Sequence, residues 1–275
     1  MKIITLLENH QDPDQPELKA EHGVSFYIEN NGNVFMSDVG QSRYFADNAL
    51  KLGIDLSAVE ALAISHHHYD HGGGLRHFFE VNKTAPVYLK SSPPDVDYVE
   101  ENAGQPLGDI GLDKVLLKEF ENRIVYITEK VEIPSGFHLL TDIPETYPKP
   151  RGDERLKMKK GDVIVPDTFD HEIVTVLETD DGLVILTGCG HNGVLNMIEA
   201  ARRAFPGKPV IAMIGGFHLH HESERSVRDV AKAILSMGIP AVYTGHCTGE
   251  DALDILEDEL GERLHRLTTG MIIHI

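Results

Sequence analysis

Four side chains that could bind a metal ion lie within six residues, spaced as His-x-His-x-Asp-His: His66, His68, Asp70 and His71. Imidazole nitrogens and carboxylate oxygens both suit a borderline cation such as Zn²⁺. In an extended segment, residues 66 and 68 project to the same side and can share one ion. A turn after Tyr69 would direct Asp70 and His71 towards a second, adjacent ion. The spacing therefore predicts a site for divalent cations rather than a solvent-exposed, histidine-rich loop.

The residues around this cluster indicate how it is positioned. The apolar run Val59–Ile64 leads directly into the cluster and is typical of a strand covered on both faces. Gly72, Gly73 and Gly74 allow the chain to reverse tightly behind the ligands. His67 should point away from its neighbours, so we interpret it as a bystander.

Two further histidines could reach the same cleft. His218 follows the apolar run Val210–Ile214, near a strand end where functional sites collect. It could contact an ion or a ligand of one, or simply cap a helix or lie at the surface. His22 precedes the predicted strand Val24–Ile28 and could contribute to substrate binding.

The rest of the chain supplies strands and helices at both ends. Strands are predicted at Lys2–Leu7, Val34–Met36, Glu172–Leu177, Leu183–Leu186, Ala241–Thr244 and Met271–Ile275, and helices at Tyr44–Leu52, Asn192–Phe205, Ser223–Met237 and Asp251–Leu260. Such a mixture predicts sheets covered by helices.

The middle of the chain differs in composition. Residues 91–118 are rich in proline, glycine and acidic residues, and Arg151–Gly161 is strongly charged. We interpret residues 91–170 as a lid or insertion. Its basic side chains, Lys157 and Lys160 among them, either form a solvated loop or bind a substrate phosphate.

Composition narrows the class of function. The 275 residues include 25 Lys and Arg against 44 Asp and Glu, which gives a net charge of −19. Nucleic acids and anionic membranes need a protein with a basic face, so neither is an expected partner. We expect a small-molecule substrate, and the oligomeric state is left open.

No apolar run approaches the roughly 18 residues that span a bilayer. Two cysteines cannot form a disulfide framework, and a reducing cytoplasm is the expected location.

Five sequence blocks resemble one known family. They are EHGVSFYIE (21–29), SHHHYDHGGGL (65–75), TGCGHNGVLNMIEAAR (187–202), GGFHL (215–219) and GHCTG (245–249). The strand followed by His-x-His-x-Asp-His and Gly-Gly-Leu is similar to the metallo-β-lactamase superfamily. The later blocks resemble, more narrowly, its archaeal and bacterial group around dihydropterin-ribofuranosylaminobenzene-phosphate synthase.

The resemblance implies an α+β fold, the four-layer αβ/βα sandwich, as a single domain over residues 1–275. It also implies one or two metal ions at the sheet edge. The two implied ligand sets are His66, His68 and His191 for the first ion, and Asp70, His71 and His246 for the second. Zinc is expected, with iron or manganese as alternatives.

Two positions need separate interpretation. Many superfamily members have an aspartate that bridges the ions directly after a Thr-Gly, where this chain has Cys189. Either its thiolate is a ligand, or it is a small buried side chain and water fills the gap. Asp38 resembles the early aspartate motif, and we expect it to orient a ligand histidine rather than to bind metal.

The implied function is a metal-dependent hydrolase acting on an ester, lactone or phosphate-containing small molecule. Two cations would activate a water molecule, and Asp70 would orient it. The narrower resemblance implies an alternative, in which a dihydropterin diphosphate condenses with ribofuranosylaminobenzene 5′-phosphate and releases pyrophosphate. A non-catalytic metal-binding sensor of the same fold is the second alternative.

Overall fold

Two large sheets form the centre of the molecule. The computed structural model describes residues 1–93, 95–133 and 136–275. Among these residues, the first sheet has seven strands in the order β18 (Ile272–His274), β1 (Lys2–Leu7), β2 (Ser25–Asn30), β3 (Asn33–Ser37), β4 (Ala61–Ala63), β5 (Val87–Lys90) and β8 (Ile124–Ile127). The second, also of seven described strands, runs β17 (Leu264–Arg266), β16 (Ala241–Gly245), β15 (Val210–Gly216), β14 (Leu183–Leu186), β13 (Val174–Glu178), β10 (Phe137–Leu140) and β9 (Val131–Ile133).

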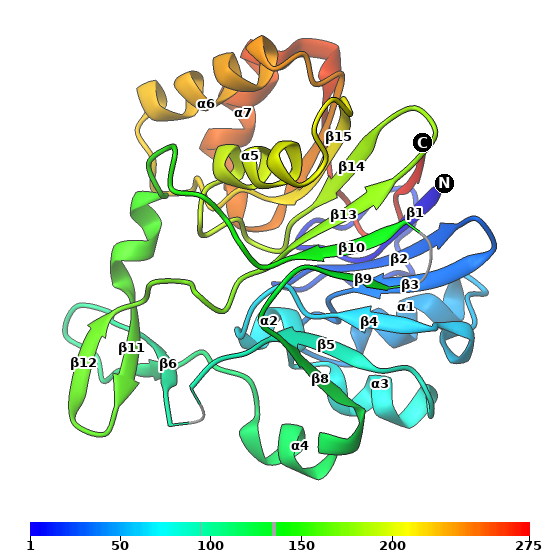
Figure 1. Cartoon of the computed structure of the whole chain (residues 1–275), viewed down its shortest axis with the longest axis vertical. Coiled ribbons are helices and arrows are strands. Elements are labelled where there is room, and N and C mark those ends of the chain that lie inside the picture. The colour runs from blue at the N-terminus through cyan, green and yellow to red at the C-terminus, as the bar shows by residue number, and fades with distance from the viewer. Residues whose placement is uncertain (94, 134–135) are drawn as a thin grey trace.

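Helices cover the outer face of each sheet (Figure 1). The first sheet is covered by α1 (Tyr44–Lys51), α3 (Leu75–Val81) and α4 (Lys114–Glu119), and the second by α5 (Val194–Ala204), α6 (Glu224–Ser236) and α7 (Glu250–Leu260). The four-layer αβ/βα sandwich predicted from the sequence is therefore confirmed. Chain ends meet at one edge, where the amino group of Met1 donates to the carbonyl oxygen of Ile275.

Side-chain alternation along the strands produces three hydrophobic layers. Successive side chains of a strand point to opposite faces of its sheet. In β1, Ile4 and Leu6 pack under the first set of helices, whereas Ile3 packs between the sheets. In β14, Ile185 packs under the second set of helices, whereas Val184 faces the other sheet. The two sheets thus bury one common layer and need a helix layer on each outer face.

A smaller sheet projects from the side of the sandwich (Figure 1). Its order is β12 (Val163–Pro166), β11 (Leu156–Lys160), β6 (Asp97–Glu100) and β7 (Gly108–Asp109). The charged stretch Arg151–Gly161, for which a solvated loop was one of two interpretations, contains strand β11 and is therefore not a loop over Leu156–Lys160. Pairing with β6 and β12 overrides the low strand propensity of its lysines. Between residues 91 and 170, β8, β9 and β10 belong to the two large sheets instead.

Parallel strands set where the functional loops emerge. Strands β3 and β4 run parallel in the first sheet, and β14, β15 and β16 run parallel in the second. Their carboxyl ends point to the same edge of the sandwich, so the loops that follow them converge. Among the described residues, no helix combines the length and apolarity needed to cross a membrane.

Candidate metal centre

Five loops, each following a parallel strand, bring the candidate side chains together. Asp38 follows β3, His66 to His71 follow β4, Cys189 and His191 follow β14, His218 follows β15, and His246 follows β16. The segment after β4 enters the short helix α2 (Tyr69–Gly72), which places Asp70 and His71 on its first turn. Residues from both halves of the chain therefore meet at the seam between the two sheets.

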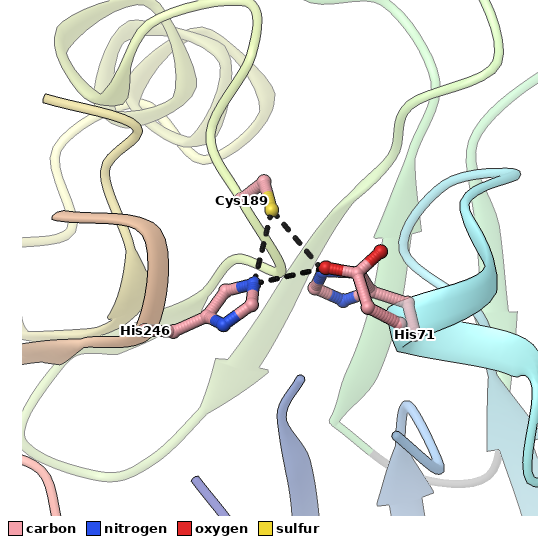
Figure 2. Close-up of side chains that lie close together, drawn as sticks. His71, Cys189 and His246 are labelled. Atoms are coloured by element: carbon pink, nitrogen blue, oxygen red, sulfur yellow. Dashed lines mark hydrogen bonds and ion pairs between the residues drawn. The ribbon is translucent and has the colours of Figure 1, made fainter. Parts of the chain in front are cut away.

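Four buried side chains form the first group of potential ligands. One ligand atom from each of Asp70, His71, Cys189 and His246 lies within 4.8 Å of the others. The Cys189 sulfur lies 3.1 Å from His71 Nε2 and 3.3 Å from His246 Nε2, between the two rings (Figure 2). Asp70 Oδ2 lies 3.3 Å from His246 Nε2. Two nitrogens, one sulfur and one oxygen around a common point suit a tetrahedral zinc ion.

A second group of potential ligands adjoins the first. His66 Nε2 lies 3.0 Å from His68 Nδ1, and these two histidines group with Asp70. His66 also groups with His191 and Cys189. Because Asp70 and Cys189 belong to both groups, the arrangement can hold two neighbouring cations that share a carboxylate and a thiolate.

The outer ring nitrogens of these histidines are held by polar partners. Asp38 Oδ2 lies 2.8 Å from His71 Nδ1, and Asp153 Oδ1 lies 2.7 Å from His191 Nδ1. Asn9 Oδ1 lies 2.9 Å from His246 Nδ1. Ser65 Oγ lies 2.9 Å from His66 Nδ1. Such partners fix the tautomer and orientation of metal-binding imidazoles, leaving the inner nitrogen as the ligand atom.

Unsatisfied buried atoms test whether a cation fits. Nε2 of His191, on the side of the ring away from Asp153, is buried and has no hydrogen-bond partner among the described residues. A buried polar atom without a partner is costly, and a bound cation would accept its lone pair. The donor set, the held outer nitrogens and this unpartnered atom all fit a divalent metal ion.

The protonation states of His66, His68 and Asp70 agree with metal ligation. Burial lowers the pKa of His66 and of His68 well below the usual value, so both rings are neutral and can donate a lone pair. Burial alone would raise the pKa of Asp70, but the neighbouring His71, with hydrogen bonds from His22 and others, lowers it well below its usual range. Asp70 is therefore ionised at neutral pH. His71 differs, because burial alone would lower its pKa but Asp70 and Asp38 raise it well above the usual value, so a metal ion at Nε2 would have to displace a proton.

Cys189 needs a cation to become a thiolate. Burial raises the pKa of the Cys189 thiol well above its usual value. A metal ion beside Sγ reverses this effect, since a coordinating thiol loses its proton. The neighbouring Cys247 thiol donates to the carbonyl oxygen of Cys189 and helps to fix its backbone.

Several other predicted site residues lie beside the ligands. His22 Nε2 lies 3.2 Å from Asp70 Oδ2, and its ring is half exposed at the opening. His218 Nδ1 lies 3.0 Å from Asp153 Oδ1, next to His191. Asp38 contacts His71 rather than the ligand atoms, as its predicted orienting role requires.

The two predicted phosphate-binding lysines do not reach the cleft. Lys157 Nζ donates to the carbonyl oxygen of Glu154, and Lys160 pairs with Asp95. The described residues that line the cleft include neither lysine. The cleft receives Arg155, which precedes β11, and Leu156, the first residue of that strand, instead. The structure therefore does not place these lysines beside the ligand groups.

The residues that hold the ligand histidines in place were not predicted, because they come from segments without a recognisable motif. Asp153 lies in a short 3-10 turn at Arg151–Arg155, and Asn9 lies in the loop after β1. Glu172 Oε1 and Oε2 accept the backbone N–H groups of His191 and Asn192 and so hold that loop. The sequence offered one indication of Asn9: the first apolar strand ends abruptly at Glu8-Asn9-His10.

The ligands open into a cleft of about 260 Å³. Its lining includes His22, Tyr69, Arg155, Leu156 and His220. Arg155 pairs with Glu100 across 3.4 Å and carries a half-exposed guanidinium. The cleft is large enough for the reacting part of a small molecule, not for a folded macromolecule.

Comparison with known proteins gives consistent matches. The sequence model of the metallo-β-lactamase superfamily matches residues 18–107. The chain is 28% identical to the 7,8-dihydropterin-6-methyl-4-(β-D-ribofuranosyl)-aminobenzene-5′-phosphate synthase of Methanocaldococcus jannaschii, over 99% of this chain and 96% of that protein. The predicted resemblance is therefore confirmed.

Solved structures give the same result for the fold. Tm1679, described as a metal-dependent hydrolase of the β-lactamase superfamily, is 27% identical to this chain and superposes on it with a TM-score of 0.85. The match covers 100% of this chain and 99% of Tm1679. Zn²⁺-bound PqqB of Methylobacterium extorquens shares the fold at 10% identity and a TM-score of 0.56, each chain being covered in full.

Proposed function

We propose that this protein, which has the metallo-β-lactamase fold, is a metal-dependent hydrolase that cleaves an ester, lactone or phosphate bond in a small molecule. One observation carries the proposal: two groups of potential ligands share Asp70 and Cys189, and their outer ring nitrogens are held by Asp38, Asp153 and Asn9. Such preorganised, paired sites are the arrangement that metal-assisted hydrolysis requires.

The proposed ligands divide into two sets. His66, His68 and His191 would hold one ion, and Asp70, His71 and His246 the other, with Cys189 between them. Bound divalent cations would supply Lewis acidity at an ester or phosphate oxygen and would lower the pKa of a water molecule towards neutrality. We propose zinc, with iron or manganese as alternatives, because the donors mix nitrogen, oxygen and sulfur.

The chain's own groups would position the reactants. Asp70 is ionised and lies at the junction of both ligand groups, so its carboxylate can accept a proton from an attacking water. His22 contacts Asp70 through Nε2 and can donate that proton to a leaving oxygen. Arg155 in the cleft supports an anionic group on the substrate, such as a phosphate.

A second candidate function rests on one comparison. The synthase of Methanocaldococcus jannaschii matches this chain almost from end to end. In the corresponding reaction, a pterin methylene carbon would lose its C–O bond to pyrophosphate and form a C–N bond to an aromatic amine, which releases a proton. The same ligand groups and Arg155 would then hold the leaving pyrophosphate instead of activating water.

One experiment separates these functions. Metal-free protein is reconstituted with Zn²⁺, Mn²⁺ or Fe²⁺ and supplied with a phosphodiester, a lactone and a thioester, and separately with the pterin diphosphate and ribofuranosylaminobenzene phosphate pair. His68→Ala should abolish turnover, and His77→Ala, at a partly exposed histidine of α3 outside the ligand groups, should not.

Each outcome has one meaning. Hydrolysis without condensation supports the hydrolase. Pyrophosphate release that requires both halves of the pair supports the synthase and contradicts the hydrolase. Bound metal without turnover on any substrate contradicts both and leaves a metal-binding sensor.

A further inference from the structure

One candidate ligand histidine lacks the polar partner that the other four have at their outer ring nitrogens. His68 Nδ1 lies 3.0 Å from His66 Nε2 and so faces the ligand groups. His68 Nε2, on the other side of the ring, is buried and has no hydrogen-bond partner among the described residues. Because a buried polar atom without a partner is costly, this nitrogen indicates a contact that forms only in another state of the site.

A buried carboxylate lies opposite this nitrogen. Asp167 follows directly after strand β12, and its Oδ2 lies 4.0 Å from His68 Nε2. The Asp167 side chain is fully buried. Its Oδ1 accepts the backbone N–H of Phe169 across 2.8 Å, which fixes the carboxylate and leaves Oδ2 for the histidines. The gap to His68 is about 1 Å longer than a hydrogen bond, so a small adjustment closes it.

A second histidine at Asp167 has a tautomer that its partners define. His171 Nδ1 accepts the backbone N–H of His67 across 3.0 Å, so the ring proton sits on Nε2. His171 Nε2 donates that proton to Asp167 Oδ2 across 3.1 Å. Both nitrogens of His171 are therefore in use, whereas Oδ2 of Asp167 can accept a second hydrogen bond.

These contacts decide between two roles for the group His68, Asp167 and His171. One ligand atom from each residue lies within 4.8 Å of the others, which would suit a third cation. Such a cation would need a lone pair from His171, which would have to give up its bond to Asp167 or to the backbone of His67. A carboxylate that accepts from both rings satisfies all of these atoms. The hydrogen bonds therefore favour orientation of His68 over binding of a third ion.

The segment that carries Asp167 also contacts the ligand loops at other points. The Phe169 ring stacks on the His191 ring, with centroids 4.4 Å apart and an angle of 9° between the planes. Ile173 N donates to the carbonyl oxygen of Ser65 across 2.8 Å. Phe169 has a φ of 56°, in the left-handed region that non-glycine residues seldom adopt. Strain of this kind persists where surrounding contacts hold the backbone in place, so the segment is fixed against the ligand histidines.

We propose that Asp167 is a positioning residue for His68: its Oδ2 accepts a proton from His68 Nε2 and thereby leaves the lone pair of Nδ1 for the first metal ion. This inference rests on the proposed metal sites and not on the reaction that they support. Because His68 belongs to the proposed ligand set of the first ion only, Asp167 should influence that ion selectively.

Asp167→Asn changes the one atom on which the proposal depends. The asparagine oxygen can still accept the N–H of Phe169, whereas its amino group replaces Oδ2 and meets two ring N–H donors. Asp170→Asn is the matched control, because Asp170 is exposed in the same segment, accepts the hydroxyl of Thr168 and belongs to none of the ligand groups. Competition with a chromophoric chelator measures the Zn²⁺ affinities, and circular dichroism checks the fold of each metal-free protein.

The expected effect is confined to one ion. Asp167→Asn should bind one Zn²⁺ about 10–100-fold more weakly, the usual effect of losing such a partner, and the other with unchanged affinity. Asp170→Asn should bind both ions as the wild-type protein does. Unchanged affinities in Asp167→Asn, equal weakening of both ions, or the same loss in both variants would overturn the inference. A third tightly held ion that Asp167→Asn releases would also overturn it and would assign the group to cation binding.

A measurement on the wild-type protein does not depend on the folding of a variant. Imidazole ¹H–¹⁵N correlation spectra of protein labelled with ¹⁵N-histidine report which ring nitrogen carries the proton. We expect a proton on Nε2 of His171 with and without Zn²⁺, and on Nε2 of His68 when Zn²⁺ is bound. A proton on Nδ1 of either ring in the Zn²⁺-bound protein would overturn the inference, whatever its effect on turnover.

Failure of this inference differs from failure of the proposed function. Two bound ions whose affinities do not change in Asp167→Asn, in a protein that hydrolyses its substrate, would overturn the positioning role and leave the hydrolase intact. Selective weakening of one ion, without turnover on any substrate, would support the positioning role and contradict the hydrolase. Absence of Zn²⁺ binding by the wild-type protein would overturn both.

Discussion

Cys189 belongs to both groups of potential metal ligands. Its sulfur lies within hydrogen-bonding distance of both His71 Nε2 and His246 Nε2, and it also groups with His66 and His191. Burial keeps the isolated thiol protonated, so thiolate formation is linked to metal binding. The side chain is thus a candidate bridging ligand and not only a filler of the core.

Replacement of Cys189 tests this role. We expect Cys189→Ala to weaken binding of at least one metal ion, and Cys189→Asp to retain it, because a carboxylate can replace the bridging donor. The Co²⁺-substituted wild-type protein should show a thiolate-to-metal charge-transfer band in the near ultraviolet that both variants lack. Such a band persisting in Cys189→Ala would exclude Cys189 as its source.

Asp38 contacts a candidate ligand and belongs to neither ligand group. Its carboxylate contacts His71 Nδ1 and accepts from both the backbone N–H and the hydroxyl of Ser65. We expect Asp38→Asn to lower metal affinity by about 10–100-fold, the usual effect of losing such a partner, while the fold persists. Isothermal titration with Zn²⁺ measures the affinity, and circular dichroism checks the fold. An unchanged affinity would show that His71 does not need this partner.

The sequence could predict the ligands but not all of their partners. His66, His68, Asp70 and His71 form a local motif directly after a buried strand, so their convergence follows from the chain alone. Asp153 could not be found, because it approaches His191 from a turn that is 38 residues away in a stretch with no motif. For the same reason, the sequence could not show that Lys157 and Lys160 lie outside the cleft lining.

At the scale of elements, close contact between the two sheets brings the ligand loops together. Gly188, directly after β14, has no room for a side chain, because a Cβ there would lie 2.0 Å from Ser65 Oγ and 2.9 Å from His71 Nδ1. The sheets could not approach this closely with any larger residue at that point. Strand pairing and layers could be predicted from alternating apolar residues, but this contact between distant loops could not.

Gly188→Ala should therefore destabilise the fold. We expect a loss of about 1–3 kcal/mol in the free energy of unfolding, as overpacking in a tight interior produces. Urea denaturation measures it, with Gly108→Ala as the control, since nothing lies within 4 Å of a Cβ at that position. Equal stability of the two variants would contradict the close packing.

The loop after β1 contains a histidine that couples stability to pH. Hydrogen bonding to Glu8 raises the pKa of His10 to about 9, against a partial opposing effect of burial, and Glu250 adds to the increase. Since the folded pKa lies above the unfolded value of 6.5, the stabilisation is complete below pH 6.5 and is lost as pH rises towards about 9.

Removal of this histidine should flatten that dependence. The difference in unfolding free energy between the wild-type protein and His10→Gln should shrink as pH is raised from about 6 to about 9.5. Because the His10 ring is about one-third exposed, we expect the change to be small but resolvable by urea denaturation at several pH values. A constant difference across this range would show that His10 does not carry a raised pKa.

At the scale of the whole molecule, the candidate ligand groups lie at the seam between the two sheets, where residues distant in the sequence meet. Asn9 and His246, 237 residues apart, contact each other there, and the termini pair at a sheet edge. A cation at the seam would tie loops from both halves of the chain together. Its binding to the folded state alone would stabilise the protein by about 2.7 kcal/mol at a free-ion concentration of 100 Kd.

The metal content of the purified protein decides whether the candidate ligand groups bind two cations. The protein is stripped with a chelator, reconstituted with Zn²⁺, dialysed and measured by inductively coupled plasma mass spectrometry. His68→Ala is measured beside it, with His77→Ala, at a partly exposed histidine, as the control. We expect two tightly held ions per chain in the wild-type protein and in His77→Ala, and fewer in His68→Ala. No bound zinc in the wild-type protein, or the same content in all three, would contradict it.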